Sequence, residues 1–471
     1  MVTLNDLKLI LPEIILAGGA VVVMLMIALR RNHFISNVLT LITFAVAFFF
    51  LTGLPKGEQL VTHLFLIDSL GRFLTGLILC AAFVITLYSF PYFHIQKEVK
   101  EEYYILLILA TLGSVCMTIS NHFLSFILSL EVLSVSLFSL IGYLKKEKSS
   151  IEAGIKYLIM AAVASAFVLF GFALIYAATG KMNLQDLATT FRDAPMNILV
   201  LAGLALTIVG FGFKMALVPF HLWTPDIYSA APAPVAAFVA TISKGAAFVF
   251  LLRLFYSVGG LLHEGIWIAF AVIATASMFI GNWLGLRQQN IKRLIAYSSI
   301  SHLGYLMVGF LAFSIPGIRA TAFYLVIYFA SILAAFGMIT YLSGKKGEPV
   351  MIEDYRGLFW TKPWLAAFFT LVMLSLAGVP FTAGFMGKFY VLASGMNTGK
   401  LFLLIVLVVS STIGLFYYLR VVATMLSRAE VHFEDYIGRQ SWILKLLVAV
   451  LFVLILWLGI YPTTFFRMMG I

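Results

Sequence analysis

Residues Gly210–Val235 read "GFGFKMALVPFHLWTPDIYSAAPAPV" and place a charged side chain at the end of an apolar run. Lys214 is that charge, and four prolines follow it between Pro219 and Pro234. Proline removes a backbone hydrogen bond, so the carbonyls that it frees inside a membrane need partners from protein or from cavity water. The stretch therefore predicts a broken helix beside a buried charge.

The composition of the whole chain indicates an integral membrane protein. Of 471 residues, 62% are hydrophobic and 11% are charged, and the mean hydropathy is +1.05. Soluble domains carry about 25% charged residues. The long continuous apolar runs favour helices over a β-barrel, whose strands alternate in segments of about ten residues. The fold class is predicted as an all-α polytopic membrane protein with about 14 transmembrane helices.

These spans are predicted at 8–29, 34–54, 67–90, 103–119, 122–144, 151–178, 196–217, 231–256, 264–285, 291–312, 320–342, 361–395, 400–427 and 443–463. The first run lacks a positively charged start and a small-residue cleavage site, so we expect it to be a retained span and not a signal peptide. A retained first span without a transit peptide favours a bacterial plasma membrane over a thylakoid.

The formal charge of +11 is explained by membrane topology. If the connections between 14 spans alternate sides, sixteen Lys and Arg residues fall on one side and seven on the other. The positive-inside rule places the richer side in the cytoplasm and both termini outside. The surplus therefore needs no nucleic-acid partner. Cys80 and Cys116 lack metal-ligand spacing and are predicted to be small apolar core residues without a metal.

Eight basic residues remain in or beside the spans. Three lie near span ends, where a long side chain reaches the interface: Arg72, Arg253 and Lys445. Lys214, Lys244 and Lys388 lie deeper, and each costs about 2.5–3.5 kcal/mol at a membrane centre unless it is paired, hydrated or neutral. Such residues indicate an ion or proton path, and the alternative is an ion pair that only holds helices together.

Two further ionisable groups lie within predicted spans. Glu131 is in "HFLSFILSLEVLSVSLFSLIGY", where no other carboxylate is placed so deeply, and His302 is in "IAYSSISHLGYLMVGF". A nearby carboxylate strengthens the hold of a buried lysine on its proton, and imidazole carries a proton readily near neutral pH. Together with the three lysines, these residues are predicted to form a proton relay.

The broken helix occurs twice. Pro380 and Gly384 interrupt "LAGVPFTAGFMGKFYV", which contains Lys388. Lys388 follows Lys214 by 174 residues and His302 follows Glu131 by 171, so we expect two five-helix units. An odd number of spans in each unit makes the second one inverted, as in many transporters. The predicted divisions are a three-helix segment 1–102, repeats 103–256 and 264–427, and a last helix in 428–471.

The segment "HLWTPDIYSAAPAPV" is predicted to be a proline-rich loop at the membrane interface. Trp223 and Tyr228 suit an aromatic belt, and Asp226 is expected to cap the next helix. His221, just beyond the break, is a weaker candidate for proton entry. The sequence contains no phosphate loop and no cysteine cluster for iron–sulfur, so no cofactor is expected in this chain.

These residues resemble the antiporter-like subunits of respiratory complex I. The resemblance covers nearly the whole chain and rests on Glu131, "KMALVPFHLWTPDIYSAAPAPVAAFVATISKGAAF", "NIKRLIAYSSISHLGYLMVG" and "GVPFTAGFMGKFYV". Three paralogous types share the fold. The long C-terminal lateral helix of the L-type is not expected here, and the M-type usually has glutamate at the position of Lys388. The motif "WTPDIY" is also similar to that of the N-type.

The resemblance implies a membrane-arm subunit that contributes one proton channel to an NADH:quinone oxidoreductase, and thus a translocase subunit without a redox centre. Glu131 and Lys214 would form a pair in which the carboxylate modulates how strongly the lysine holds its proton. Lys244 and His302 would pass the proton along the midplane, and Lys388 would exchange it with the far side or with the neighbouring subunit. Lys156 matches a lysine of the family, and both Lys156 and Tyr297 are weaker candidates for the proton path.

The resemblance also implies M-type and K-type neighbours in the bilayer, with FMN, iron–sulfur clusters, NADH and quinone in or near other subunits. Two alternatives stay open at this point. One is a subunit of a multi-subunit cation/proton antiporter, and the other is a structural membrane scaffold.

Overall fold

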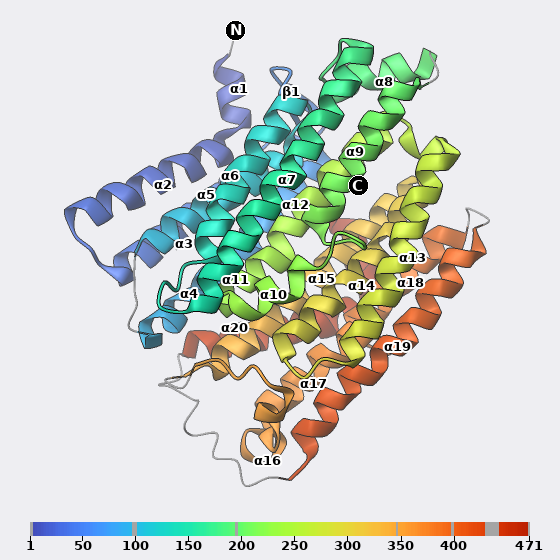
Figure 1. The fold of residues 1–471 in the computed structure, drawn as a ribbon. Helices are drawn as coiled ribbons and strands as arrows, with labels where there is room; N and C mark the ends of the chain where they lie inside the picture. Colours follow the sequence, from blue (N-terminus) through green and yellow to red (C-terminus); the bar gives the residue numbers. More distant parts are fainter. Residues whose placement is uncertain are drawn as a thin grey trace.

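The computed structural model describes residues 3–96, 101–193, 196–344, 347–396, 400–428 and 442–469, and the chain forms a bundle of helices (Figure 1). Five of the basic residues counted above lie outside the described residues: Lys97, Lys100, Lys345, Lys346 and Arg439.

The N-terminal segment contributes helices and a short hairpin to the bundle. Its elements are α1 (Leu4–Leu9), α2 (Leu11–Leu29), α3 (His33–Thr52), β1 (Gln59–Val61), β2 (Phe65–Ile67) and α4 (Ser69–Gln96). The two strands are antiparallel, with Leu60 opposite Leu66. Pro12 lies in the first turn of α2, where a missing backbone N–H costs little. Helix α1 ends at Leu9, just before α2 begins at Leu11.

The middle of the chain contains the first predicted repeat. Its elements are α5 (Glu102–Ile119), α6 (Phe123–Ile141), α7 (Lys148–Thr179), α8 (Leu184–Asp193), α9 (Ile198–Met215), α10 (Trp223–Ala230), α11 (Ala233–Phe238), the π-helical turn η1 (Val239–Ser243) and α12 (Lys244–Ser257). The predicted span 231–256 is thus one helical run with a π turn in its middle, directly before Lys244. Apolar periodicity does not show such a turn, and π turns are frequent at functional sites.

The second predicted repeat and the C-terminal helices follow. Their elements are η2 (Gly260–Leu262), α13 (Glu264–Leu286), α14 (Ile291–Leu311), α15 (Ile315–Leu342), η3 (Ile352–Tyr355), α16 (Leu358–Thr361), α17 (Pro363–Ala377), α18 (Ala383–Met396), α19 (Leu401–Leu426), α20 (Trp442–Ile460) and α21 (Pro462–Met469).

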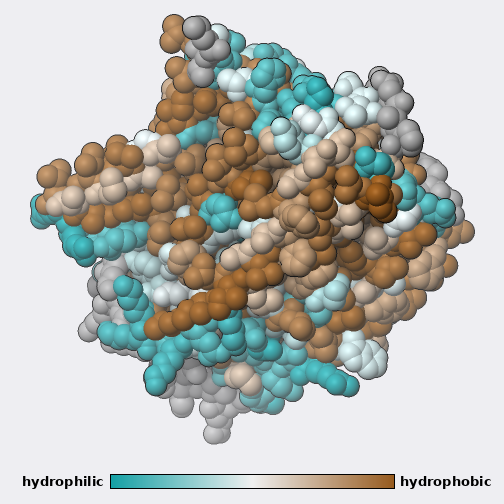
Figure 2. Space-filling model, turned by 45° about the horizontal axis from the view of Figure 1, so that its top comes forward, coloured by the Kyte–Doolittle hydropathy of each residue, from teal (hydrophilic) through white to brown (hydrophobic). Residues whose placement is uncertain are grey.

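Among the described residues, thirteen helices are long and apolar enough to cross a membrane, counting Ala233–Ser257 as one. The remaining predicted span, 361–395, is divided into α17 and α18 at the predicted break. The run Ala233–Ser257 and helices α14 and α15 are buried along almost their whole length, so they form the centre of the bundle. Figure 2 shows apolar side chains over broad parts of the outer surface, as expected for a chain surrounded by lipid.

One helix crossing is repeated in both predicted units. A Cβ atom on Gly113 of α5 would lie 2.7 Å from the Leu133 backbone nitrogen of α6. A Cβ atom on Gly281 of α13 would lie 2.8 Å from the Ser301 backbone nitrogen of α14. Both contacts join residues twenty apart, so the two helix pairs cross in the same way. This packing supports the predicted repeats, although their exact boundaries stay a prediction.

The shared crossing corrects the predicted correspondence between repeats. Gly281 follows Gly113 by 168 residues, and this register aligns Ser134 with His302 and Glu131 with Ser299. The predicted match of Glu131 with His302 was therefore displaced by about one helical turn. Ionisable side chains alone do not fix a register, because a helix places residues three or four apart on the same face.

The two breaks also differ from the prediction. Lys214 lies in the last turn before the first break, where Ala216 has a positive φ of 60°. Lys388 lies beyond the second break, where Gly378 has φ 84° and ends α17. The two lysines are therefore not at equivalent positions of the repeats. Both lysines nevertheless lie at the carboxyl end of the helix before the break. Lys214 belongs to the last turn of α9, and Lys388 contacts the last turn of α17 from the following helix.

The segment predicted as an interfacial loop is instead a helix in the interior. Trp223 and Tyr228 of α10 are buried, because α10 packs against α7 and α14. Asp226 does not cap the next helix, since its Oδ1 pairs with Arg293 Nη1 of α14 at 2.6 Å. Asp226 is the residue of this segment that forms an ion pair, and its side chain stays 46% exposed.

We predict that Gly113→Val and Gly281→Val each destabilise the protein by about 1–3 kcal/mol, because the added atoms overpack a backbone contact. Thermal unfolding of the purified protein in detergent would show a lower midpoint for both variants. Gly18→Val is the control, since a Cβ at Gly18 meets nothing within 4 Å. Wild-type melting of both crossing variants would contradict this packing.

Candidate functional site

Lys244 lies at the centre of a buried polar network. Its side chain is fully buried, and Nζ donates a hydrogen bond to Ser299 Oγ at 2.8 Å. The Ser299 hydroxyl also bonds the Tyr328 hydroxyl at 2.6 Å. Tyr328 in turn donates to the Ala240 carbonyl of the π turn at 2.8 Å. Helices α12, α14 and α15 thus meet at one lysine, and one of the bonds ends on the turn that precedes it.

His302 lies one turn further along α14 and forms a second hydrogen-bonded group, with its ring centroid 6.0 Å from that of Tyr328. Its Nδ1 is 2.7 Å from the Tyr324 hydroxyl and its Nε2 is 3.2 Å from the Tyr418 hydroxyl. Tyr418 also bonds the Ser298 hydroxyl. Because hydroxyl groups and imidazole both donate and accept, the imidazole and the hydroxyls that bond it are suited to transfer protons.

Lys388 is held at the carboxyl end of α17. Its Nζ donates to the Leu376 carbonyl at 3.1 Å, to the Ala377 carbonyl at 2.7 Å and to Ser411 Oγ at 2.8 Å. Such carbonyls lack helical partners and carry the negative end of the helix dipole, so they stabilise an ammonium group. Lys388 also lines a cavity of about 280 Å³ with Pro380 and Ser411. This lysine therefore has contact with space outside the central network.

Lys214 is buried, but its predicted partner is not in contact. Its Nζ donates to Ser134 Oγ and to the Tyr157 hydroxyl, each at 3.0 Å. Within the described residues it makes no ion pair with Glu131, which is only partly buried and lies one turn from Ser134. The role of Glu131 as a modulating partner of Lys214 therefore stays a prediction, without a direct ion pair between the two side chains. Neutral hydroxyls occupy the position in which the carboxylate was expected.

Aromatic rings separate Lys214 from Lys244. The Tyr157 and Trp223 ring centroids are 5.5 Å apart. Lys244 Nζ is 5.9 Å from the Trp223 centroid and 5.1 Å from the Tyr228 centroid. A cation is attracted to an aromatic face at such distances. The two lysines thus lie on either side of a small aromatic partition rather than in one hydrogen-bonded chain.

The three weaker candidates have different surroundings. Lys156 is on the outer face of α7 and pairs with Glu152 at 2.6 Å, so it is outside the network. Tyr297 is buried, but its hydroxyl makes no hydrogen bond to any described residue. His221 is buried in the first break, and neither ring nitrogen has a hydrogen-bond partner in the part of the chain that the structure describes. Polar groups of this kind bind buried water.

The residues that sequence reasoning missed are mostly tyrosines. Tyr324 and Tyr328 are four residues apart in α15, so both face α14, and this spacing inside an apolar span was the available signal. Tyr157, which directly follows Lys156, bonds Lys214 and was not singled out from the sequence. The described residues contain no group of three or more His, Cys, Asp or Glu side chains that could hold a metal ion. Cys80 is exposed and Cys116 is partly exposed, so the expectation of two core cysteines was wrong.

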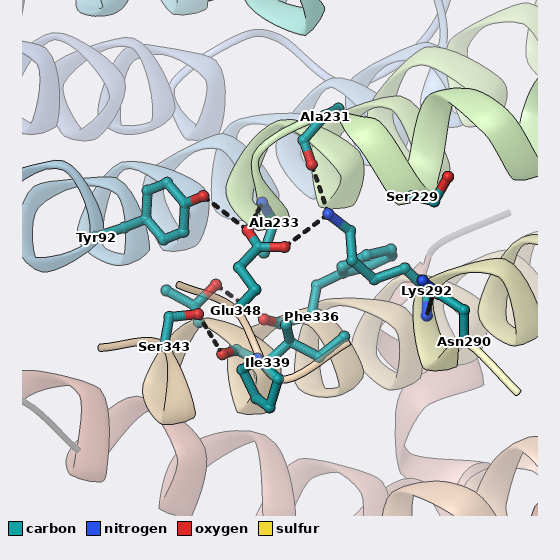
Figure 3. A network of polar contacts seen from close by, with 12 residues as sticks. Tyr92, Ser229, Ala231, Ala233, Asn290, Lys292, Phe336, Ile339, Ser343 and Glu348 are labelled. Carbon is teal, nitrogen blue, oxygen red and sulfur yellow. Dashed lines mark hydrogen bonds and ion pairs between the residues drawn. The ribbon is translucent and has the colours of Figure 1, made fainter. Parts of the chain in front are cut away.

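Two basic residues assigned to surfaces are buried in ion pairs. Arg253, expected to reach the interface, donates through Nη1 to Asp68 Oδ2 at 3.0 Å and through Nε to the Thr118 carbonyl at 2.8 Å. Lys292, counted among the connecting segments, pairs with Glu348 Oε2 at 2.7 Å. Figure 3 shows the Glu348 carboxylate between Lys292, Tyr92 and Ala233. Long-range partners of this kind are not visible in sequence periodicity.

Comparison with known proteins identifies the family. The model of the family described as "NADH:quinone oxidoreductase/Mrp antiporter, TM" matches residues 120–414, more than half of the chain. This chain belongs to that family. It is an antiporter-like membrane subunit of the complex I type of assembly.

Solved structures agree over nearly the full length. A chain of respiratory complex I from Thermus thermophilus is 30% identical, with 97% of this chain and 98% of that chain covered and a TM-score of 0.83. A chain of the archaeal membrane-bound sulfane sulfur reductase is 25% identical, with 98% and 96% covered and a TM-score of 0.83. A chain of the Mrp complex from Dietzia sp. DQ12-45-1b is 18% identical, with 99% and 96% covered and a TM-score of 0.86, and it shows the shared fold.

We predict that Tyr328→Phe destabilises the protein by about 1–3 kcal/mol, because the Ala240 carbonyl and Ser299 each lose a buried partner. Thermal unfolding in detergent measures the effect. Tyr297→Phe is the matched control, since it removes a hydroxyl without a hydrogen-bond partner from a neighbouring buried position. Equal midpoints for the two variants would contradict the assigned bonds.

Proposed function

We propose that this chain is the N-type, proton-translocating membrane subunit of an NADH:quinone oxidoreductase. The observation that carries the proposal is the buried network that joins Lys244, Ser299 and Tyr328 beside His302 at the centre of the bundle. The amine is hydrogen-bonded to hydroxyls and the imidazole to other hydroxyls, and the His302 and Tyr328 ring centroids are 6.0 Å apart, so the two groups together suit proton transfer. Respiratory complex I from Thermus thermophilus, of which one chain is 30% identical, supports the assembly.

The proposed division of roles follows the contacts. Lys214, bonded by neutral hydroxyls, binds or releases a proton according to how near the Glu131 carboxylate comes. Lys244 and His302 exchange protons through Ser299, Ser298 and the tyrosines. Lys388 exchanges protons with a neighbouring subunit or the far side through the cavity that it lines. Lys156 has no proposed part, and His221 remains a candidate at the entry.

Other subunits supply the redox chemistry in this proposal. NADH, FMN, iron–sulfur clusters and quinone belong to or near those subunits, and this chain contacts M-type and K-type neighbours. The assembly lies in a bacterial plasma membrane, with both termini of this chain on the outer side. The Lys/Arg-rich side is then cytoplasmic.

A second candidate is a subunit of a multi-subunit cation/proton antiporter, which the fold shared with the Mrp chain favours. Reconstitution of the complex in vesicles with an imposed sodium gradient separates the two. We expect proton movement that depends on NADH and is independent of sodium. Sodium-driven proton movement without NADH would support the antiporter.

We predict that Lys214→Ala lowers the number of protons pumped per NADH oxidised, because the switchable amine is lost. Proton uptake by inverted vesicles, measured with a pH-sensitive dye during NADH oxidation, gives this ratio. Lys156→Ala is the matched control, since its side chain is exposed and pairs with the neighbouring Glu152 on the outer face of α7. An assembled Lys214→Ala complex that pumps normally would refute the relay.

We predict that Glu131→Gln reduces the same ratio in the same direction but by a smaller amount, because Lys214 keeps its bonds to Ser134 and Tyr157. Native gels would check assembly, since buried charge changes also affect stability. A larger loss in Glu131→Gln than in Lys214→Ala would contradict a modulating role for the carboxylate.

A further inference from the structure

The Glu348–Lys292 ion pair lies at the inner wall of a cavity of about 610 Å³. The Lys292 side chain is 1% exposed and that of Glu348 is 10% exposed. The cavity is lined in part by Ile95, Glu147 and Gly344, which lie at or beyond span ends on the Lys/Arg-rich side. A buried ionisable pair is therefore within reach of an aqueous space on that side.

Glu348 has several partners besides Lys292. Its Oε1 accepts hydrogen bonds from the Tyr92 hydroxyl at 2.7 Å and from the Ala233 backbone N–H at 2.8 Å. Lys292 Nζ also donates to the Ala231 carbonyl at 2.6 Å. Figure 3 shows these groups around one carboxylate. The pair thus links α4, the junction of α10 and α11, and the start of α14.

Two features place this pair near the relay. Lys292 and Ser299 are seven residues apart in α14, so they lie on one face about 10.5 Å apart along the axis. Ser229 lines the cavity, and the preceding Tyr228 has its ring centroid 5.1 Å from Lys244 Nζ. The Tyr228 hydroxyl and Thr224 Oγ1 are buried and have no hydrogen-bond partner among the described residues, and such groups bind buried water.

We propose that the Glu348–Lys292 pair is a proton-loading site that feeds Lys244 from this cavity, an inference that rests on the proposed proton translocation. The Glu348 carboxylate takes up a proton from cavity water and becomes neutral, which weakens its pairing with Lys292. Transfer of that proton to the neutral Lys244 amine forms its ammonium and restores the Glu348 carboxylate. Among the described residues, the ionisable groups around Glu348 are Lys292, Tyr92, Glu147 and Tyr355.

Glu348→Gln in the intact complex tests the proposal. The rate of proton transfer through this channel, read from the rate of NADH-driven pumping, is expected to fall roughly tenfold at about pH 8, a barrier increase of about 1.4 kcal/mol, with a much smaller loss at about pH 6. A proton-collecting group matters most when free protons are scarce. Glu353→Gln is the matched control, because Glu353 pairs with Arg356 in the same segment but is exposed.

A second variant separates loading from stability. Glu348→Gln leaves Lys292 buried and unpaired, which can hinder assembly, whereas Lys292→Gln with Glu348→Gln removes both charges. The double variant is expected to assemble and to show the same pH-dependent loss. An equal loss at both pH values indicates a structural role and would overturn the proposal, as would wild-type pumping.

Two further measurements complete the test. Ser229→Cys should react with a membrane-impermeant maleimide from the Lys/Arg-rich side, while Ser298→Cys should not, and an unreactive Ser229→Cys would overturn the entry route. Lys214→Ala is measured in parallel. Normal pumping in that variant refutes the proposed function, whereas its loss together with normal pumping in Glu348→Gln refutes only the loading site.

Discussion

The structure depends on how an apolar bundle accommodates lysine ammonium groups. An unsolvated charge in hydrocarbon is costly, so each amine needs polar contacts from nearby protein. Lys388 uses the free carbonyls at the end of α17, and Lys214 uses hydroxyls of α6 and α7. Lys244 uses Ser299 and lies above two aromatic rings. None of these contacts is an ion pair, so each amine can lose its proton without leaving a buried carboxylate behind.

The breaks in the helices serve the same requirement. A continuous helix satisfies its own carbonyls and has none to offer a buried cation, whereas an interrupted one does. The π turn before Lys244 has a related effect, since its Ala240 carbonyl accepts a bond from Tyr328. Ion pairs are found near the two ends of the run Ala233–Ser257, Glu348 with Lys292 at one end and Asp68 with Arg253 at the other. The helix that carries Lys244 is thus held at both ends and irregular in its middle.

Sequence reasoning was strongest where the physics is local. Apolar length gave the spans, proline and glycine gave the breaks, and the cost of burial singled out the three lysines, all of which are buried. It was weaker at predicting which polar side chains contact each other. Glu131 does not contact Lys214, Lys156 lies outside the network while Tyr157 lies within it, and the surface assignments of Arg253 and Lys292 were wrong. Each error concerns which of several polar groups on neighbouring helices meet.

The sequence by itself therefore determined the membrane class, the approximate number of spans, the broken helices and the three lysines whose burial is costly. These features follow from hydrophobicity and backbone chemistry, which act within one segment. Only the tertiary structure decided the repeat register, the tyrosines around His302, the aromatic partition between Lys214 and Lys244, and the Glu348 cluster. These depend on helix rotation and on contacts between residues far apart in the chain. A shift of one helical turn leaves the hydrophobic pattern nearly unchanged but exchanges every polar partner.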